Sequence, residues 1–177
     1  MRIVAGEWGG RTLRAPPGGR TRPTADRVRE ALFSILGPID GLRVLDLFAG
    51  SGALGIEALS RGAAQATFVE RDRAAADVVR RNLADVGAGE RATIVMRDAI
   101  AWLKGTRGNE AFDLVLLDPP YDSADRLGGP LTEHLPGVLA PDAVIVSESD
   151  KRSPLELGLP RADERTYGDT RIVIHRR

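Results

Sequence analysis

The stretch RVLDLFAGSGALGIEAL, residues 43–59, is the part of the sequence that decides the fold. Its first six residues are mostly apolar and predict a buried strand, and the residues from Ser51 onward predict a helix. Gly50, Gly52 and Gly55 form a G-x-G-x-x-G pattern at this junction. A glycine-rich turn between a strand and a helix is typical of α/β proteins that bind a nucleotide-like ligand where the strand ends.

The rest of the chain repeats this alternation of strand and helix. Buried strands are predicted at residues 43–48, 66–71, 92–97, 112–118 and 143–148. Helices are predicted between them at residues 51–62, 72–87, 98–105 and 124–139. The alternation predicts a doubly wound α/β fold with a mostly parallel sheet. Two short runs joined around Gly168 and Asp169 predict a C-terminal hairpin that adds two antiparallel strands, which makes a seven-stranded sheet.

The N-terminal part of the chain predicts a small extension. Residues 2–16 contain glycine turns and predict a β-hairpin, and residues 24–37 predict a helix with Thr24 as its N-cap and Gly37 as its end. Residues 1–29 carry seven Arg against two acidic residues, although the whole chain has a net charge of +0. This basic arm indicates either a polyanionic partner or an ordinary solvated surface. We therefore divide the chain into an extension, residues 1–22, and a main domain, residues 23–177.

Composition excludes several classes of protein. The chain has 177 residues, no Cys and two His, so a disulfide scaffold, a thiolate zinc site and a Cys nucleophile are excluded and no metal centre is expected. No apolar run reaches the roughly 18 residues of a membrane span, and no signal peptide is recognisable at the N-terminus. These features predict a cytoplasmic globular protein, with a monomer as the simplest assembly.

Three acidic residues favour one class of cofactor. Asp46 lies inside the strand before Gly50, and Glu70 ends the next predicted strand, where an acid can hold a ribose. The carboxylate of Asp46 would repel the pyrophosphate of NAD, whereas it would attract the ammonium and sulfonium groups of S-adenosylmethionine. Asp98, which follows the third strand, can accept a hydrogen bond from an adenine amine or simply cap a helix.

The sequence Asp118-Pro119-Pro120-Tyr121 follows the fourth predicted strand. Two prolines make this turn stiff and remove backbone donors, so it presents acceptors. The Asp118 carboxylate and the Pro119 carbonyl can hold the two hydrogens of an amine on a planar base, and Tyr121 offers a ring for stacking. The turn therefore predicts methyl transfer to an amino group of a base that has left its stack.

These motifs resemble those of class I S-adenosylmethionine-dependent amino-methyltransferases, which have a Rossmann-like fold. RIVAGEWGGRTLRAP, residues 2–16, followed by RPTADRVREALFSIL, residues 22–36, closely resembles the start of the RsmD family. Those enzymes methylate the N2 amine of a guanine in bacterial 16S ribosomal RNA. The resemblance implies Asp118 and Tyr121 at the amine, and an N-terminal hairpin in contact with RNA. The partner it implies is 16S rRNA in a 30S subunit or an assembly intermediate, and the product is S-adenosylhomocysteine.

The resulting site prediction has three parts. The predicted catalytic residues are Asp118, Pro119 and Tyr121. The predicted cofactor contacts are Asp46, Phe48, Gly50, Gly52, Glu70, Arg71, Asp98 and Ala99. The predicted RNA contacts are Arg2, Arg11, Arg14, Arg20, Arg22 and Arg27. Arg22 and Arg27, with Thr24, could instead border the methyl-transfer pocket or only shape the start of the helix.

Other readings of the sequence stay open at this point. The acceptor could be a DNA adenine or a protein glutamine, although no insertion for DNA recognition is present. An NAD-dependent oxidoreductase and a catalytically silent RNA-binding module are weaker alternatives. Trp8 could stack on RNA or fill a small core, Trp102 is expected to pack, and His134 and His175 are expected at the surface.

Overall fold

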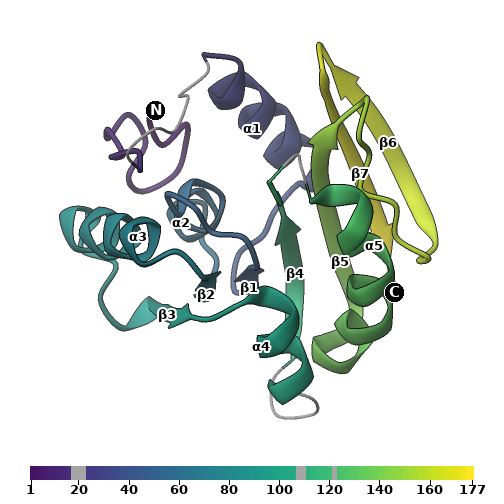
Figure 1. The fold of residues 1–177 in the computed structure, drawn as a ribbon. Helices are drawn as coiled ribbons and strands as arrows, with labels where there is room; N and C mark the ends of the chain where they lie inside the picture. The colour runs from purple at the N-terminus through teal and green to yellow at the C-terminus, as the bar shows by residue number, and fades with distance from the viewer. Residues whose placement is uncertain (17–22, 107–110, 121–122) are drawn as a thin grey trace.

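The computed structural model describes residues 1–16, 23–106, 111–120 and 123–177, and a seven-stranded sheet forms its centre (Figure 1). The strands lie in the order β3-β2-β1-β4-β5-β7-β6. Their bounds are β1 Arg43–Asp46, β2 Gln65–Glu70, β3 Ala92–Met96, β4 Phe112–Leu117, β5 Leu139–Asp150, β6 Arg161–Tyr167 and β7 Thr170–Arg176. Strands β1 to β5 run parallel, and β7 and β6 add antiparallel strands beside β5. The predicted fold class is confirmed.

Helices cover both faces of the sheet (Figure 1). The helices on one face are α1 Pro23–Leu36, α2 Ala53–Ser60 and α3 Arg73–Val86, and those on the other are α4 Ala99–Thr106 and α5 Ala124–His134. Each face has its own apolar core, so the central strands are buried on both sides. This burial explains why β1 and β4 are almost continuously apolar. Trp102 packs at 6.1 Å from the ring of Phe112, as the sequence predicted.

The ends of several elements differ from the prediction. Helix α5 ends at His134 and continues as a short 3₁₀ helix, Leu135–Val138, because Pro136 interrupts the α-helical hydrogen-bond pattern. Strand β5 is longer than predicted and reaches Asp150. Helix α1 begins at Pro23, so Thr24 lies inside it and not at the N-cap, while Gly37 ends it with a φ of 74° as predicted.

The two histidines are buried, so the prediction that they lie at the surface is wrong. His134 lies at the inner side of the end of α5, and His175 lies in β7 between β5 and β6. The Nδ1 atom of His175 is 3.1 Å from the carbonyl oxygen of Leu159, and burial lowers the pKa of its ring. A neutral His of this kind is a structural residue.

The N-terminal segment, residues 1–16, folds back on itself but forms only a single β-bridge, between Arg2 and Thr12. Its apolar side chains Ile3, Trp8 and Leu13 are buried in the core that α1, α2 and α3 share. Trp8 therefore fills a core position, and the guanidinium of Arg91 lies 4.7 Å from its ring centre. The division of the chain at residue 22 falls outside the described residues and stays a prediction.

A buried carboxylate attaches this segment to the main domain. The side chain of Glu57 on α2 has no exposed surface, and it accepts hydrogen bonds from the backbone N–H groups of Val4, at 2.7 Å, and Ala5, at 3.0 Å. Arg61 and Arg29 pair with the same carboxylate at 2.7 and 3.4 Å. Because an unpaired buried charge is costly, these four contacts explain how Glu57 is accommodated and why the segment stays docked.

Candidate functional site

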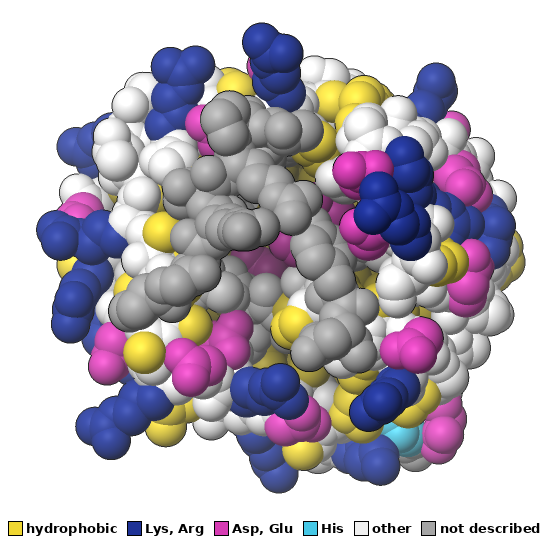
Figure 2. All heavy atoms as spheres, turned by 45° about the horizontal axis from the view of Figure 1, so that its top comes forward, with side chains coloured by type: hydrophobic (Ala, Val, Ile, Leu, Met, Phe, Trp, Pro, Cys, Tyr) yellow, Lys and Arg dark blue, Asp and Glu magenta, His cyan; other side chains and the backbone are white. Residues whose placement is uncertain are grey.

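A cavity of about 400 Å³ lies at the carboxyl edge of the sheet, where the order of the strands reverses between β1 and β4. Ligands of open α/β sheets bind at this place. In Figure 2, acidic side chains are visible at the centre of this face and Arg and Lys side chains lie around its margin. The cavity is lined by residues 46–51, 53, 54, 69–71, 97–99, 118–120, 123 and 127.

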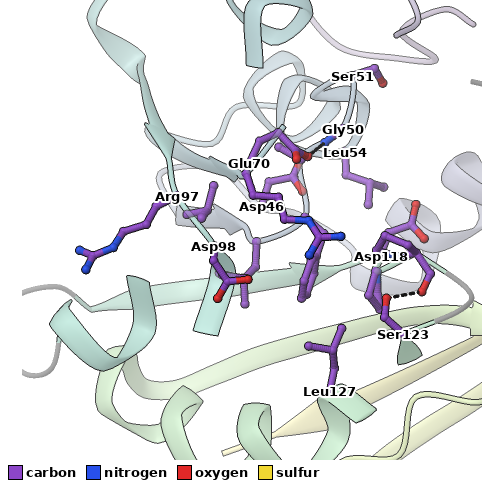
Figure 3. Close-up of a pocket in the computed structure, with 18 of the residues that line it drawn as sticks. Asp46, Gly50, Ser51, Leu54, Glu70, Arg97, Asp98, Asp118, Ser123 and Leu127 are labelled. Carbon is purple, nitrogen blue, oxygen red and sulfur yellow. Dashed lines mark hydrogen bonds between the residues drawn. The ribbon is translucent and has the colours of Figure 1, made fainter. Parts of the chain in front are cut away.

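The glycine turn after β1 forms one wall of the cavity (Figure 3). Gly50 has a φ of 54°, in the left-handed region that favours glycine. The Oε2 atom of Glu70 accepts the N–H of Gly50 at 2.8 Å, and its Oε1 atom accepts the N–H of Asp72 at 2.8 Å. Glu70 therefore fixes the turn, and its oxygens retain lone pairs for a hydroxyl donor in the cavity.

Asp46 lies at the floor of the site. It is buried, and its Oδ2 atom accepts the N–H of Gly55 at 2.9 Å, in the first turn of α2. Burial, together with the negative charges of Asp118 and Glu70, raises the pKa of its carboxyl to about 7, against the lowering effect of the Gly55 bond. A site of this kind favours a cationic ligand, because a cation offsets the repulsion among the carboxylates.

The third glycine of the pattern has a packing role. A Cβ atom on Gly55 would lie 2.4 Å from Cε1 of Phe68 on β2, so only glycine allows α2 to approach the sheet this closely. Gly52 has a φ of 79° and begins α2 but does not line the cavity. Of the three glycines, Gly50 alone lines the cavity.

Asp98 caps a helix and also lies on the wall of the cavity. Its Oδ1 atom accepts the N–H of Ala101 at 2.9 Å, which caps α4, and the residue also lines the cavity. Figure 3 shows the Asp98 carboxylate beside the cavity, whereas the side chain of Arg97 extends away from the other labelled residues. Asp98 can therefore accept a further hydrogen bond from a ligand.

The turn Asp118-Pro119-Pro120 forms the wall opposite the glycine turn. Ser123 donates to the carbonyl of Pro120 from its backbone N–H, at 3.0 Å, and from its hydroxyl, at 2.9 Å. Within the described residues no group donates to the Pro119 carbonyl or to the Asp118 carboxylate. The Asp118 side chain is open to the cavity, yet surrounding protein displaces bulk water and raises the pKa of its carboxyl to about 6.

Comparisons with known proteins decide the family. The model of a family described as Conserved hypothetical protein 95 matches residues 1–176. A protein of Escherichia coli strain K12, named Ribosomal RNA small subunit methyltransferase D, is 45% identical over 168 residues, which cover 90% of this chain and 78% of that protein. The chain belongs to the RsmD family.

Further relatives agree with this assignment. The protein of the same name from Haemophilus influenzae is 40% identical over 159 residues, which cover 88% of this chain and 81% of that protein. A solved structure from Escherichia coli superposes with a TM-score of 0.83 at 38% identity, and covers 100% of this chain and 97% of its own. The resemblance drawn from the N-terminal motifs is confirmed.

The cavity of this RsmD-family chain brings together most of the residues predicted to form its site. Nine of the eleven predicted catalytic and cofactor residues line it: Asp46, Phe48, Gly50, Glu70, Arg71, Asp98, Ala99, Asp118 and Pro119. Gly52 does not line it, and Tyr121 lies outside the described residues. The sequence prediction missed Ser123 and Leu127, although their four-residue spacing at the start of a helix after the Pro-Pro turn could have placed both on one face.

The arginines predicted to contact RNA occupy different environments in this RsmD-family chain. Arg2 and Arg27 are exposed. Arg11 donates to the carbonyl of Val86 at 3.1 Å, and Arg14 pairs with Asp85 at 3.0 Å. Both side chains therefore contact the C-terminal end of α3 within the protein. The two remaining positions, Arg20 and Arg22, lie outside the described residues.

Two further observations concern membranes and metals. None of the described helices is both long enough and apolar enough to cross a bilayer. Within the same part of the chain, no group of three or more His, Cys, Asp or Glu side chains is arranged to hold a metal ion.

Proposed function

We propose that this protein transfers a methyl group from S-adenosylmethionine to the N2 amine of a guanine in 16S rRNA. The observation that carries the proposal is the position of Asp118 and the unoccupied acceptor of Pro119 on the wall of the same cavity that Asp46 and Glu70 line. Membership of the RsmD family supports it, because relatives from Escherichia coli and Haemophilus influenzae are named small subunit rRNA methyltransferases.

The cavity suits S-adenosylmethionine better than NAD. Asp46 and Glu70 are two carboxylates at one end of it, and their repulsion raises the pKa of Asp46. An ammonium or sulfonium group relieves that repulsion, whereas a pyrophosphate would increase it. In this binding mode Glu70 accepts a ribose hydroxyl and Asp98 accepts the adenine amine. Bound in this way, S-adenosylmethionine supplies a methyl group activated by positive sulfur.

Asp118 and Pro119 prepare the acceptor nitrogen. An amine on an aromatic ring is a poor nucleophile because its lone pair is delocalised into the ring. Two acceptors that hold its hydrogens favour tetrahedral geometry at nitrogen and free the lone pair for the methyl carbon. As the carbon–nitrogen bond forms, the methyl–sulfur bond would break and its electron pair would stay on sulfur, which leaves S-adenosylhomocysteine and a positively charged nitrogen. The Asp118 carboxylate can then take up the proton that leaves this nitrogen. Tyr121 is proposed to stack on the base.

The exposed arginines are proposed to position the RNA. Arg2 and Arg27 have side chains available for phosphates, and each phosphate contact that is lost should lower the log–log salt slope by about 0.7 to 0.9. Substitution is a better test than truncation, because Ile3, Trp8 and Leu13 belong to the core. The proposed partner is 16S rRNA in a 30S subunit or assembly intermediate, in the cytoplasm, with the protein acting as a monomer.

The test is transfer of labelled methyl groups from S-adenosylmethionine to 30S particles that lack the modification, followed by nucleoside analysis. We expect N2-methylguanosine as the labelled product. Asp118→Ala should lower the single-turnover rate by about 10²–10³, the usual cost of losing a key electrostatic contact. Asp125→Ala provides the matched control, because Asp125 is exposed in the first turn of α5 and does not line the cavity.

Parallel reactions separate this proposal from its alternatives. Duplex DNA, a glutamine-containing peptide and free 16S rRNA replace the 30S particle in three further arms. Label in methyladenine or in the peptide, with none in rRNA, would overturn the proposed acceptor. An Asp118→Ala rate above about a tenth of the wild-type rate would show that another residue orients the amine.

A further inference from the structure

A second carboxylate lies beside Asp118 at the carboxyl edge of the sheet. Leu117 of β4 pairs with Ser147 of β5, so Asp118 and Glu148 occupy the next positions on neighbouring parallel strands. Leu116 and Val146 pair directly and contribute to the core beneath α1 to α3. Because side chains alternate along a strand, Glu148 lies on the same face of β5 as Val146, while Asp118 follows directly after the last residue of β4. The repulsion between the two carboxylates, which acts on the pKa of Glu148, agrees with this placement.

The surroundings of Glu148 leave its acceptor capacity unused. It is half-buried, and it makes no hydrogen bond or ion pair with any residue in the described part of the chain. Arg29 on α1 is near enough to attract it, but that guanidinium already binds Asp26 at 2.9 Å and Glu57 at 3.4 Å. Burial and the charge of Asp118 together raise the pKa of Glu148 to about 8. A ligand with a hydrogen-bond donor at this point would satisfy the carboxylate.

Glu148 lies beside Asp118 but outside the cavity assigned to the cofactor. Asp118 lines that cavity, whereas Glu148 does not. A base whose amine is held by Asp118 therefore has Glu148 as the neighbouring carboxyl group across the pairing of β4 with β5. The site thus offers two neighbouring carboxylates to the edge of an incoming base.

We propose that Glu148 determines which base is accepted, by taking a hydrogen bond from the ring N–H beside the target amine. The inference rests on the proposed function and extends it. In guanine the N2 amine and the N1–H are adjacent donors, which match the adjacent carboxylates of Asp118 and Glu148. In adenine and cytosine the ring nitrogen beside the amine is an acceptor, and the carboxylate that Glu148 carries above about pH 8 would be repelled by it. Asp118 holds the amine of any base, and Glu148 selects guanine.

The test, run at about pH 8.5 so that Glu148 is mostly ionised, compares guanine with 2-aminopurine at the methylated position of a synthetic 16S rRNA fragment assembled into 30S particles. 2-Aminopurine keeps the amine at C2 but has an acceptor in place of N1–H. The wild-type protein should prefer guanine by about tenfold to a hundredfold in kcat/KM, the range that corresponds to 1–3 kcal/mol for a base-edge contact. In Glu148→Gln the amide can accept from guanine or donate to 2-aminopurine, so the preference should fall at least about tenfold.

Two controls distinguish a change in base preference from a general loss of structure. Glu148→Gln should bind S-adenosylhomocysteine like the wild type, because Glu148 does not line that cavity. Glu90→Gln, an exposed substitution between α3 and β3, should leave the preference unchanged. Methylation of guanine with the same preference in Glu148→Gln and wild type would overturn this inference alone. No methylation of guanine by the wild type would overturn the proposed function and this inference with it.

Discussion

The raised pKa of Asp46 predicts that Asp46→Asn changes the pH dependence of stability. The pKa of this carboxyl is about 7 in the folded chain, against an ordinary value of 3.8. An acid with a higher pKa in the folded state binds its proton more tightly there, so its stabilising contribution is complete below about pH 3.8 and is lost as the pH rises through about 7. Asparagine has no proton to lose, so the variant lacks this loss of stability.

The size of the effect follows from these two pKa values. Each pH unit between them changes the free energy of unfolding by about 1.4 kcal/mol. Between pH 5 and pH 8 the wild-type protein should therefore lose about 2 to 3 kcal/mol that Asp46→Asn does not lose. The fall begins above about pH 3.8, where the unfolded-state carboxyl ionises, and levels off near pH 8, because the folded-state carboxyl is ionised there as well.

Urea unfolding at pH 5, 6, 7 and 8, without added cofactor, measures this difference. The free energy of unfolding of Asp46→Asn minus that of the wild type should rise with pH. The control Asp125→Asn, at an exposed position, should show the same pH dependence of unfolding as the wild type. The same substitution should weaken binding of S-adenosylhomocysteine at pH 8, so that stability is gained where function is lost. A difference that stays constant within about 0.5 kcal/mol across this range would refute our account of Asp46.

Three more predictions follow from the site. Glu70→Ala should weaken S-adenosylhomocysteine binding by about 1–3 kcal/mol, because it removes a charged acceptor and frees the Gly50 turn; calorimetry measures this, and unchanged affinity would exclude the ribose role. Single-turnover methylation should fall as the pH drops through about 6, where Asp118 takes up a proton and loses an acceptor, and Asp118→Asn should abolish that step. Gly55→Ala should lower stability by about 1–3 kcal/mol in thermal unfolding, because its Cβ atom would meet the ring of Phe68; an unchanged melting temperature would show that α2 can shift.

The sequence was sufficient to predict the parallel sheet and to name most of the polar residues that line the cavity, for a physical reason. Buried parallel strands are apolar on both faces, so β1 and β4 are recognisable without knowledge of their neighbours. The carboxyl ends of parallel strands meet at one edge, which brings Asp46, Glu70 and Asp118 together once the strands are assigned.

The features that the sequence did not predict depend on tertiary packing. Glu148 is one of several acidic residues near the end of a strand, and only the pairing of β5 with β4 places it beside Asp118. His175 was expected at the surface, yet it lies in β7, between β5 and β6, and is buried. The N-terminal residues were expected to form a hairpin, but Glu57 takes two of their backbone donors, and only one bridge forms.

The contacts of Glu57 also determine when residues 1–16 can dock on α2 while the chain is being synthesised. Val4 and Ala5 bind a carboxylate that lies 53 and 52 positions later in the chain. At a translation rate of about 5–20 residues per second, about 3–10 seconds separate the synthesis of Val4 from that of Glu57. Ile3, Trp8 and Leu13 cannot reach their places beside α2 before that helix exists. During synthesis this segment therefore closes over a helix that is made after it.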